Sequence, residues 1–462
     1  MMMTTAMKVA GMRSAALVCV LTLISMPAPA SAESLREALA KAYATNPELL
    51  SEQANLRAVD EGVPQALSNW RPTVTLSGDT GYESIDRTGD DSTRHPRSLE
   101  LTVRQPIYRG GRTVDETRQA EQEVLAGRAK LHATEQEVLL SATRAYMNVV
   151  RDEAVLRLNR ANEQRVARQL QATRDRFRVG EITRTDVAQA EARRARARAD
   201  RIQAEGVLVN SREAYRRVIG IAPGKLAKPA IKLALPANSD ESRALSRDHN
   251  PDVVNARHRE IAARHNVRKI RGELLPSVNL RGSLSTEHDT SGSGSNRQTA
   301  EVIAELTVPL YQKGNVYSRV REASQVLSQR SEDLENARRI AVEAAASTWN
   351  GLQTARAVVI SFQAEVRANE IALDGVQREA LVGSRTVLDV LDAEQELLDA
   401  NVNLVRSERN ELVARFELKS AVGGLTAREL KLPVEIYDAE RNYRRVRNRW
   451  FGGDGSGASK PR

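Results

Sequence analysis

Hydrophobic and polar residues alternate along four segments of the chain, which occur as two pairs. In one segment Leu99, Leu101 and Val103 alternate with Glu100, Thr102 and Arg104. A period of two is typical of strands with one apolar face. We therefore predict strands at residues 72–84 and 98–108, and again at 276–286 and 299–310. An apolar face opposite a charged face fits a membrane β-strand, and half of a soluble sandwich is the alternative.

Two very long helical patterns follow the strand pairs, at residues 112–178 and 315–381. Each would extend for roughly 100 Å at about 1.5 Å per residue. Returning helices are predicted at 186–219 and 389–422, after tip segments at 179–185 and 382–388. Each half of the chain is therefore predicted to form a long antiparallel helical hairpin.

The two predicted tips have related sequences, VGEITRTDVAQA and VGSRTVLDVLDA. Their Val-Gly pairs are Val179-Gly180 and Val382-Gly383. Glycine allows the positive φ at which a helix reverses. We predict Asp186 and Asp389 as N-caps of the returning helices. In the second tip Asp392 follows Asp389 by three residues, so two carboxylates share one helical face.

The tips belong to an internal repeat that extends through most of the chain. Other matching segments begin at Asn46 and Asn250 (NPELLSEQANLRA and NPDVVNARHREIA), at Arg71 and Leu275 (RPTVTLSGDTGY and LPSVNLRGSLST), and at Gln105 and Val308 (QPIYRGGR and VPLYQKGN). All pairs have an offset of 203 or 204 residues. We assign the repeats to residues 33–222 and 239–428, joined by a linker at 223–238.

Each repeat opens a helix with an Asn-Pro pair, Asn as N-cap and Pro at the first helical position. These helices are expected to run to near Asn69 and Glu273, with a kink at Pro64. Together with the returning helix, each nearly matches the long helix in length. We therefore expect the two shorter helices to stack end to end beside it. Residues 35–45, 220–238 and 423–437 would fill the remaining gap at mid-height.

The two ends of the chain differ in character. Residues 1–32 have the cations, apolar run and Ala-Ser-Ala site of a cleavable signal peptide, so we predict export. The only cysteine, Cys19, lies within it, which leaves the mature chain without disulfides or thiolate metal sites. Residues 429–462 are interpreted as the last mid-height segment followed by a basic, disordered tail.

The predicted export and the low aromatic content of the chain argue against a nucleic-acid-binding protein. The formal charge of +9 could suggest a nucleic-acid partner, but an exported chain with 3% aromatic residues offers little for stacking on bases. We expect no nucleic acid, no metal, no cofactor and no enzymatic site. The charges of Ala-rich helical segments such as EARRARARAD are interpreted as a solvated face. No stretch outside the signal peptide approaches the roughly 20 apolar residues of a membrane helix.

These motifs together resemble the TolC family of trimeric outer-membrane export channels. The most specific are FRVGEITRTDVAQAEA at the first tip and VGSRTVLDVLDAEQELLDAN at the second, with the Asn-Pro helix starts and the QPIYRGG and VPLYQKG segments. The resemblance implies a fold of long α-helical hairpins plus four transmembrane strands. Three chains would form a twelve-stranded β-barrel in outer-membrane lipid and a twelve-helix barrel in the periplasm. The closed tip would open when a periplasmic adaptor and an inner-membrane pump or ABC exporter dock.

The resemblance also implies roles for individual residues. Asp389 and Asp392 correspond to the carboxylates that ring the family's entrance. Arg385 corresponds to a cation that latches the closed tip, with Thr185 and Asp186 as its partners. The adaptor-docking positions correspond to Val179, Gly180, Val382 and Gly383.

Two functional interpretations remain open at this point. The first is an export duct for small molecules, as in multidrug efflux, or for proteins, as in type I secretion. The second is a periplasmic coiled-coil protein with a structural or adhesive role and no conductance. An ionic current through lipid bilayers would distinguish them.

Overall fold

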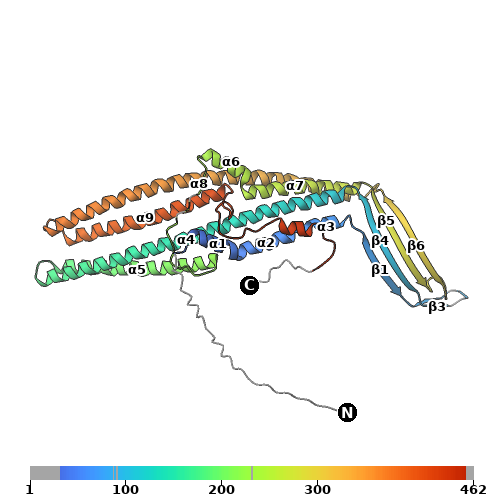
Figure 1. Ribbon diagram of the computed structural model, residues 1–462, viewed down its shortest axis with the longest axis horizontal. Coiled ribbons are helices and arrows are strands. Elements are labelled where there is room, and N and C mark those ends of the chain that lie inside the picture. The colour runs from blue at the N-terminus through green and yellow to red at the C-terminus, as the bar shows by residue number, and fades with distance from the viewer. Residues whose placement is uncertain (1–31, 87, 90–91, 230, 232, 454–462) are drawn as a thin grey trace, which may run out of the picture.

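The computed structural model describes residues 32–86, 88–89, 92–229, 231 and 233–453. They form an elongated molecule with helical hairpins along most of its length and a sheet at one end (Figure 1). The predicted signal peptide lies outside the described residues except for its last position. Within the described residues, no helix combines the length and apolarity needed to cross a membrane.

The chain order repeats one plan twice. The helices are α1 (Leu35–Thr45), α2 (Pro47–Asp60), α3 (Gly62–Ser68), α4 (Arg112–Arg178), α5 (Arg184–Ile219), α6 (Ser239–His249), α7 (Pro251–Arg271), α8 (Asn315–Leu381), α9 (Val387–Ala421) and α10 (Arg441–Val446), with a 3-10 turn η1 (Gly272–Leu274). The strands are β1 (Thr73–Thr80), β2 (Glu83–Ile85), β3 (Ser92–Arg94), β4 (Arg97–Arg109), β5 (Ser277–His288) and β6 (Asn296–Thr307).

The alternating pattern predicted four strands, and the structure joins the four long strands into one antiparallel sheet in the order β1-β4-β5-β6. The register keeps apolar residues opposite apolar residues, for example Val74 opposite Val103 and Leu101 opposite Leu284. Side chains of adjacent residues point to opposite faces, so one face of the sheet is apolar and the other is charged. The apolar face is uncovered in the single chain, where Val302 is 75% exposed.

The first strand pair differs from its prediction. β1 ends at Thr80 instead of continuing to residue 84, and a separate small hairpin of β2 and β3 follows it. Arg94 Nε donates to Glu83 Oε2 at 2.7 Å across this hairpin. The connection between the first two predicted strands therefore contains a small hairpin of its own.

The shorter helices stack end to end beside the long ones, as their lengths predicted. Asn46 caps α2 with its side-chain oxygen, while its Nδ2 donates to Val218 O near the end of α5 at 3.0 Å. Asn250 repeats this arrangement at the start of α7, donating to Ala421 O at 3.2 Å. One asparagine thus satisfies polar groups of two helix ends at once. The helix expected to kink at Pro64 is interrupted at Glu61, between α2 and α3.

The main hydrophobic core lies at mid-height, where the two helix stacks meet. Its buried members come from α1, α2, the middle of α4, the end of α5, α9 and residues 425–432. Tyr146 of α4 is fully buried there, and its hydroxyl lies 2.8 Å from Glu33 O and 2.7 Å from Ala227 O. The segments assigned to the mid-height gap therefore contribute to the same core as this tyrosine.

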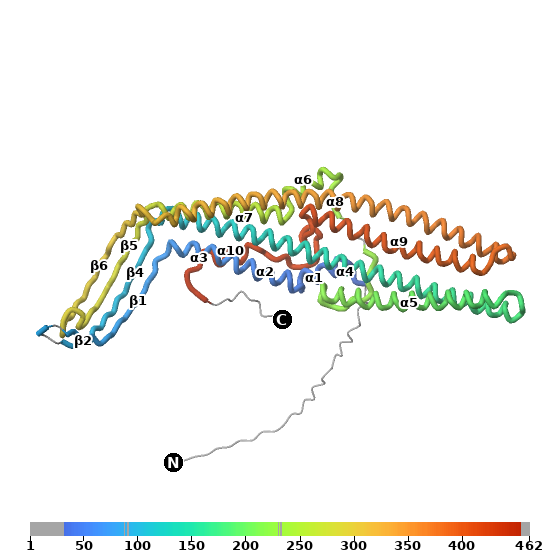
Figure 2. The backbone as a smooth tube through the Cα atoms, turned by 180° about the vertical axis from the view of Figure 1, so that it is seen from behind, coloured from blue at the N-terminus to red at the C-terminus, as the bar shows by residue number. Residues whose placement is uncertain are grey.

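The C-terminal segment, residues 438–453, corrects the prediction of a disordered tail. It contains α10 and runs beside α3 toward the start of β1 (Figure 2). Tyr443 packs against Val63 and Val124, in a small core between α3 and α4. Here the charged segment partly buries an aromatic residue, buries Asn442 and pairs its arginines with acidic residues, which keeps it ordered. Residues 454–462 lie outside the described part of the chain.

Candidate functional site at the hairpin tips

The two hairpin tips lie next to each other at the end of the molecule opposite the sheet (Figures 1 and 2). Each long helix ends at a valine followed by a glycine with positive φ, 79° at Gly180 and 78° at Gly383. A Cβ at either glycine would meet nothing within 4 Å, so the backbone conformation, and not crowding, requires glycine here.

The returning helices begin with capping boxes, which corrects the predicted N-caps. Thr183 and Thr386 are the N-caps, and α5 and α9 therefore begin at Arg184 and Val387. Asp186 and Asp389 occupy the third helical position, from which each carboxylate accepts the backbone amide of its threonine. Hydroxyl and carboxylate thus satisfy one free amide each.

This hydrogen bond from the backbone is the main reason that the pKa of Asp186 is lowered, and Thr386 has the same effect on the pKa of Asp389. Both carboxylates are therefore ionised well into the acidic range. Asp389 has a structural role in its own tip, in addition to any role in a channel entrance.

The valines of the tips are uncovered. Val179 is 77% exposed and Val382 is 81% exposed, and Leu381 beside it is equally open. Large apolar side chains at the apex of a hairpin contribute nothing to the core of the single chain. They are available for contact with another protein.

Arg385 forms its ion pair within its own hairpin. Its Nε lies 2.8 Å from Glu379 Oε2. Thr185 and Asp186, assigned as its latch partners, belong to the other hairpin, and Asp186 is engaged by Thr183. The single chain therefore does not bring the three latch residues together.

A different ion pair joins the two hairpins. Arg193 Nη2 of α5 donates to Asp392 Oδ1 of α9. Beside it, Leu391 is buried against Val166 of α4 and Ala197 of α5. Arg193 lies in EARRARARAD, whose charges were interpreted as a solvated face, so that interpretation is wrong for this residue.

A half-buried carboxylate near the second tip was missed by sequence reasoning. Burial raises the pKa of Glu394, and the nearby guanidinium groups of Arg165 and Arg168 oppose that rise. Its Oε2 is buried without a hydrogen-bond partner among the described residues. The only signal in the sequence was the high density of acidic residues after the second tip.

Comparison with known proteins places this geometry in a family. The family model described as "Outer membrane efflux protein" matches residues 38–221 and 243–424, one match in each repeat. The outer membrane efflux protein BepC of Brucella suis is 33% identical over 426 residues, covering 92% of each chain. The outer membrane protein TolC of Vibrio cholerae is 30% identical over 410 residues, covering 86% of this chain and 92% of the relative.

Solved structures share the fold. The CmeC outer membrane channel of Campylobacter jejuni superposes with a TM-score of 0.77 at 17% identity, covering 90% of this chain and 89% of that one. At this identity the likeness concerns the arrangement of hairpins and sheet alone. It agrees with the fold class predicted from the repeat.

Proposed function

This chain belongs to the outer membrane efflux protein family, and from that premise we propose that three copies assemble into the duct through which small molecules or proteins leave the cell. The molecule is an outer-membrane channel that extends into the periplasm and has no enzymatic activity. Three copies would contribute their sheets to one closed barrel in the outer membrane and their hairpins to a periplasmic tube.

The uncovered face and the unpaired edges of the sheet are the observations that support a trimer. The apolar face of the sheet is uncovered, and β1 and β6 have no strand beyond them within the described residues. An open sheet edge is not tolerated in lipid, because its amides and carbonyls would lack partners. Four strands are too few to close, about eight fill their own lumen with side chains, and larger barrels leave a channel. Three chains are the smallest number that gives a channel.

The tips would form the entrance. Around a threefold axis, copies of Asp389 and Asp392 would place carboxylates at the narrow end of the tube, with Arg193 attached to Asp392. Val179, Gly180, Val382 and Gly383 would contact the hairpins of a periplasmic adaptor, because they are exposed at the apex. An inner-membrane pump or ABC exporter would supply the energy for export.

The function is tested by electrical recording. Purified protein added to planar lipid bilayers is expected to give discrete single-channel currents, and light scattering of the same sample should give the mass of three chains. A coiled-coil protein with a structural or adhesive role would produce no current. A mass of one or two chains would contradict the trimer.

We further propose that Arg193 and Arg385 hold the closed tip, Arg193 through Asp392 and Arg385 through Thr185 and Asp186 of a hairpin brought close in the trimer. Exposed ion pairs contribute about 0–1 kcal/mol each. Three pairs released together would shift the opening equilibrium by up to about a hundredfold. Arg193→Ala and Arg385→Ala are each expected to raise single-channel conductance several-fold.

The matched control is Arg174→Ala. Arg174 pairs with Glu191 at 2.6 Å within the first hairpin, close to the tip but without joining the two hairpins. The single-channel conductance of the Arg174→Ala variant should equal that of the wild type. An unchanged conductance in Arg193→Ala would show that this ion pair does not hold the tips closed, and the same result in Arg385→Ala would remove that residue from the latch.

A further inference from the structure

The C-terminal segment is attached to the first repeat by specific polar contacts. Asn442 Nδ2 donates to the buried Asp60 Oδ2 at 2.8 Å. Arg447 pairs with Glu121 of α4 at 2.9 Å. These contacts attach the segment to the end of α2 and to α4, so its path is a feature of the fold.

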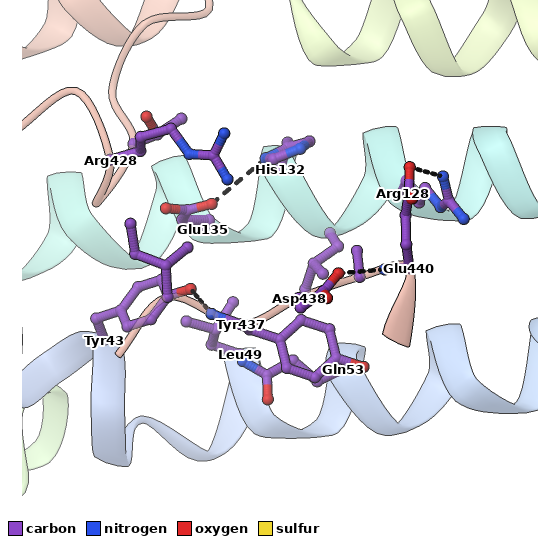
Figure 3. Close-up of a pocket in the computed structure, with 14 residues that line it drawn as sticks. Tyr43, Leu49, Gln53, Arg128, His132, Glu135, Arg428, Tyr437, Asp438 and Glu440 are labelled. Carbon is purple, nitrogen blue, oxygen red and sulfur yellow. Dashed lines mark hydrogen bonds and ion pairs between the residues drawn. The ribbon is translucent and has the colours of Figure 1, made fainter. Parts of the chain in front are cut away.

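The segment begins beside a cleft of about 440 Å³ between α2, α4 and the C-terminal residues (Figure 3). At the near end Tyr437 N donates to Tyr43 Oη at 3.1 Å. At the far end Arg128 pairs with Glu440 at 3.3 Å. The chain is thus held on both sides of the cleft before it reaches α10.

The second repeat lacks the residues that hold the segment. The repeat offsets place Arg264 at the position of Asp60, Ser324 at that of Glu121 and Ser331 at that of Arg128. None of these could form the same ion pairs or accept the same hydrogen bond. The segment therefore breaks the twofold repetition of the chain on one side only, the side that carries the edge strand β1.

The segment ends at the base of β1. The guanidinium of Arg71 lies over the ring of Trp450, 4.9 Å from its centre, and Arg71 Nη1 donates to Arg449 O at 2.7 Å. A cation over an indole face is a favourable contact. Trp450 is still 58% exposed and Phe451 is 86% exposed. Two large aromatic side chains are thus held, uncovered, at one edge of the chain.

Strand pairing between the two repeats of one chain, here called the internal joint, is a guide to strand pairing between two copies in the ring, the joint between copies. In the internal joint β4 pairs with β5, with Gln105 opposite Leu280 and Tyr108 opposite Val278. Applying the repeat offsets to these pairs gives the expected pairing between the residues that follow β6 in one copy and β1 in the next. Val308 then lies opposite Leu76, and Tyr311 lies opposite Val74. Apolar residues again face apolar residues, so the transferred register is consistent with the sheet.

The joint between copies cannot close as tightly as the internal one. In the internal joint Gly110 approaches Gly272 so closely that a Cβ on Gly110 would lie 2.3 Å from Gly272 O. The corresponding positions between copies are Lys313 and Ser68. Lys313 carries a side chain at a φ of 54°. The backbones must therefore stay further apart, which leaves a space at the base of the sheet.

Apolar side chains border this space on the other edge as well. Leu310 and Tyr311, which follow β6, are 94% and 82% exposed. In the transferred register Tyr311 lies opposite Val74 of the next copy, about 10 Å along the chain from Arg71 at roughly 3.3 Å per residue. Trp450 packs against that arginine, so the two exposed apolar groups lie within about 10 Å of each other along the strand direction.

We propose that Trp450 and Phe451 of one copy pack against Leu310 and Tyr311 of the next, filling the space at the subunit joint. The C-terminal segment then stabilises the contact between neighbouring copies at the level where the helices meet the sheet. This inference rests on the proposed ring of three chains.

Paired cysteines test the contact. The mature chain is expected to contain no cysteine, so each introduced pair is unique. A chain carrying Phe451→Cys and Tyr311→Cys, treated with a short bis-maleimide, should give covalently linked copies on denaturing gels. A chain that carries Leu76→Cys and Val308→Cys tests whether the ring forms, because these residues lie opposite each other in the transferred register. Phe451→Cys with Thr299→Cys is the negative control, because Thr299 lies near the far end of β6.

The three pairs separate the possible failures. Linked copies in the first two pairs, and none in the third, support the contact. Linkage through residues 76 and 308 without linkage through 451 and 311 overturns this inference and leaves the ring intact, as expected if the aromatic residues face lipid instead. Absence of linkage in both pairs overturns the ring, and the inference with it.

A second measurement tests how removal of the aromatic side chains affects the stability of the assembly. Trp450→Ala with Phe451→Ala should lower the temperature at which the assembled protein separates into single chains, with unchanged helix content by circular dichroism. Tyr82→Ala, an exposed aromatic residue in the β1–β4 connection, is the matched control and should leave it unchanged. Equal dissociation temperatures in both variants would contradict the proposed role.

Discussion

Replacement of both tip carboxylates, Asp389→Asn with Asp392→Asn, is expected to reverse the ion selectivity of the channel from cations to anions and to abolish its block by trivalent cations. Carboxylates gathered around one axis create a negative potential that concentrates cations. Their removal also leaves Arg193 without its partner, so the entrance becomes positive. Reversal potentials in a salt gradient, and block by a trivalent cation added on the tip side, measure the change.

Single variants and one triple variant divide the effect between the two residues. Asp392→Asn should shift selectivity more than Asp389→Asn, because it both removes a carboxylate and frees Arg193. Adding Arg193→Ala to the double variant should return selectivity to near neutral. A double variant that keeps wild-type selectivity and wild-type sensitivity to trivalent cations would show that these residues do not form the filter.

The structure also determines how acid should act on the block. The pKa of Asp389 is lowered, chiefly by the hydrogen bond from the Thr386 amide. A carboxylate with a lowered folded-state pKa stabilises the fold above its unfolded pKa, and this contribution is lost as pH falls through the folded value. The negative charge that Asp389 contributes at the entrance follows the same course. Its contribution to the block should therefore persist through the ordinary titration range of aspartate and weaken only below it.

Tyr146→Ala is expected to lower the free energy of unfolding by about 3–5 kcal/mol, which is typical of emptying a buried aromatic site. Tyr146 is fully buried in the mid-height core, where its ring lies 6.4 Å from that of Tyr215. The cavity would separate α1, α4 and the linker at the level where both helix stacks meet. Denaturant titration of the protein in detergent, followed by circular dichroism, measures the change.

Tyr146→Phe isolates the contribution of the hydroxyl. It keeps the ring but removes the donor to Glu33 O and Ala227 O, and a net cost of about 0.5–1.5 kcal/mol is expected. Tyr82→Ala removes an exposed tyrosine and should stay within about 0.5 kcal/mol of the wild type. If Tyr146→Ala were no more destabilising than Tyr82→Ala, the mid-height core would not be the main source of stability.

The features that were predictable from sequence are those with a local physical cause. A strand turns successive side chains to opposite faces, so the alternation around Leu101 and Leu284 was enough to predict the sheet and its apolar side. A helix needs a residue that allows positive φ to end as it does at Gly180 and Gly383. The repeat then fixed the order of elements in both halves.

Two errors had local causes as well. Asp186 and Asp389 were predicted as N-caps because a carboxylate caps as readily as a hydroxyl. The threonine three residues before each aspartate completes a capping box, and that spacing was present in the sequence. The tail was predicted as disordered from its arginines, although Tyr443 and Asn442 offered groups that could be buried.

Contacts between distant residues were decided by the tertiary structure alone. Arg193 and Asp392 are 199 residues apart, and Asp60 and Asn442 are 382 residues apart. Whether such residues meet depends on how long helices pack and rotate against each other. A period of 3.6 residues identifies the buried face of a helix but not the helix that covers it. For that reason Arg193 could not be distinguished by sequence from the solvated arginines beside it, and only the packing of α5 against α9 made it the partner of a carboxylate at the tip.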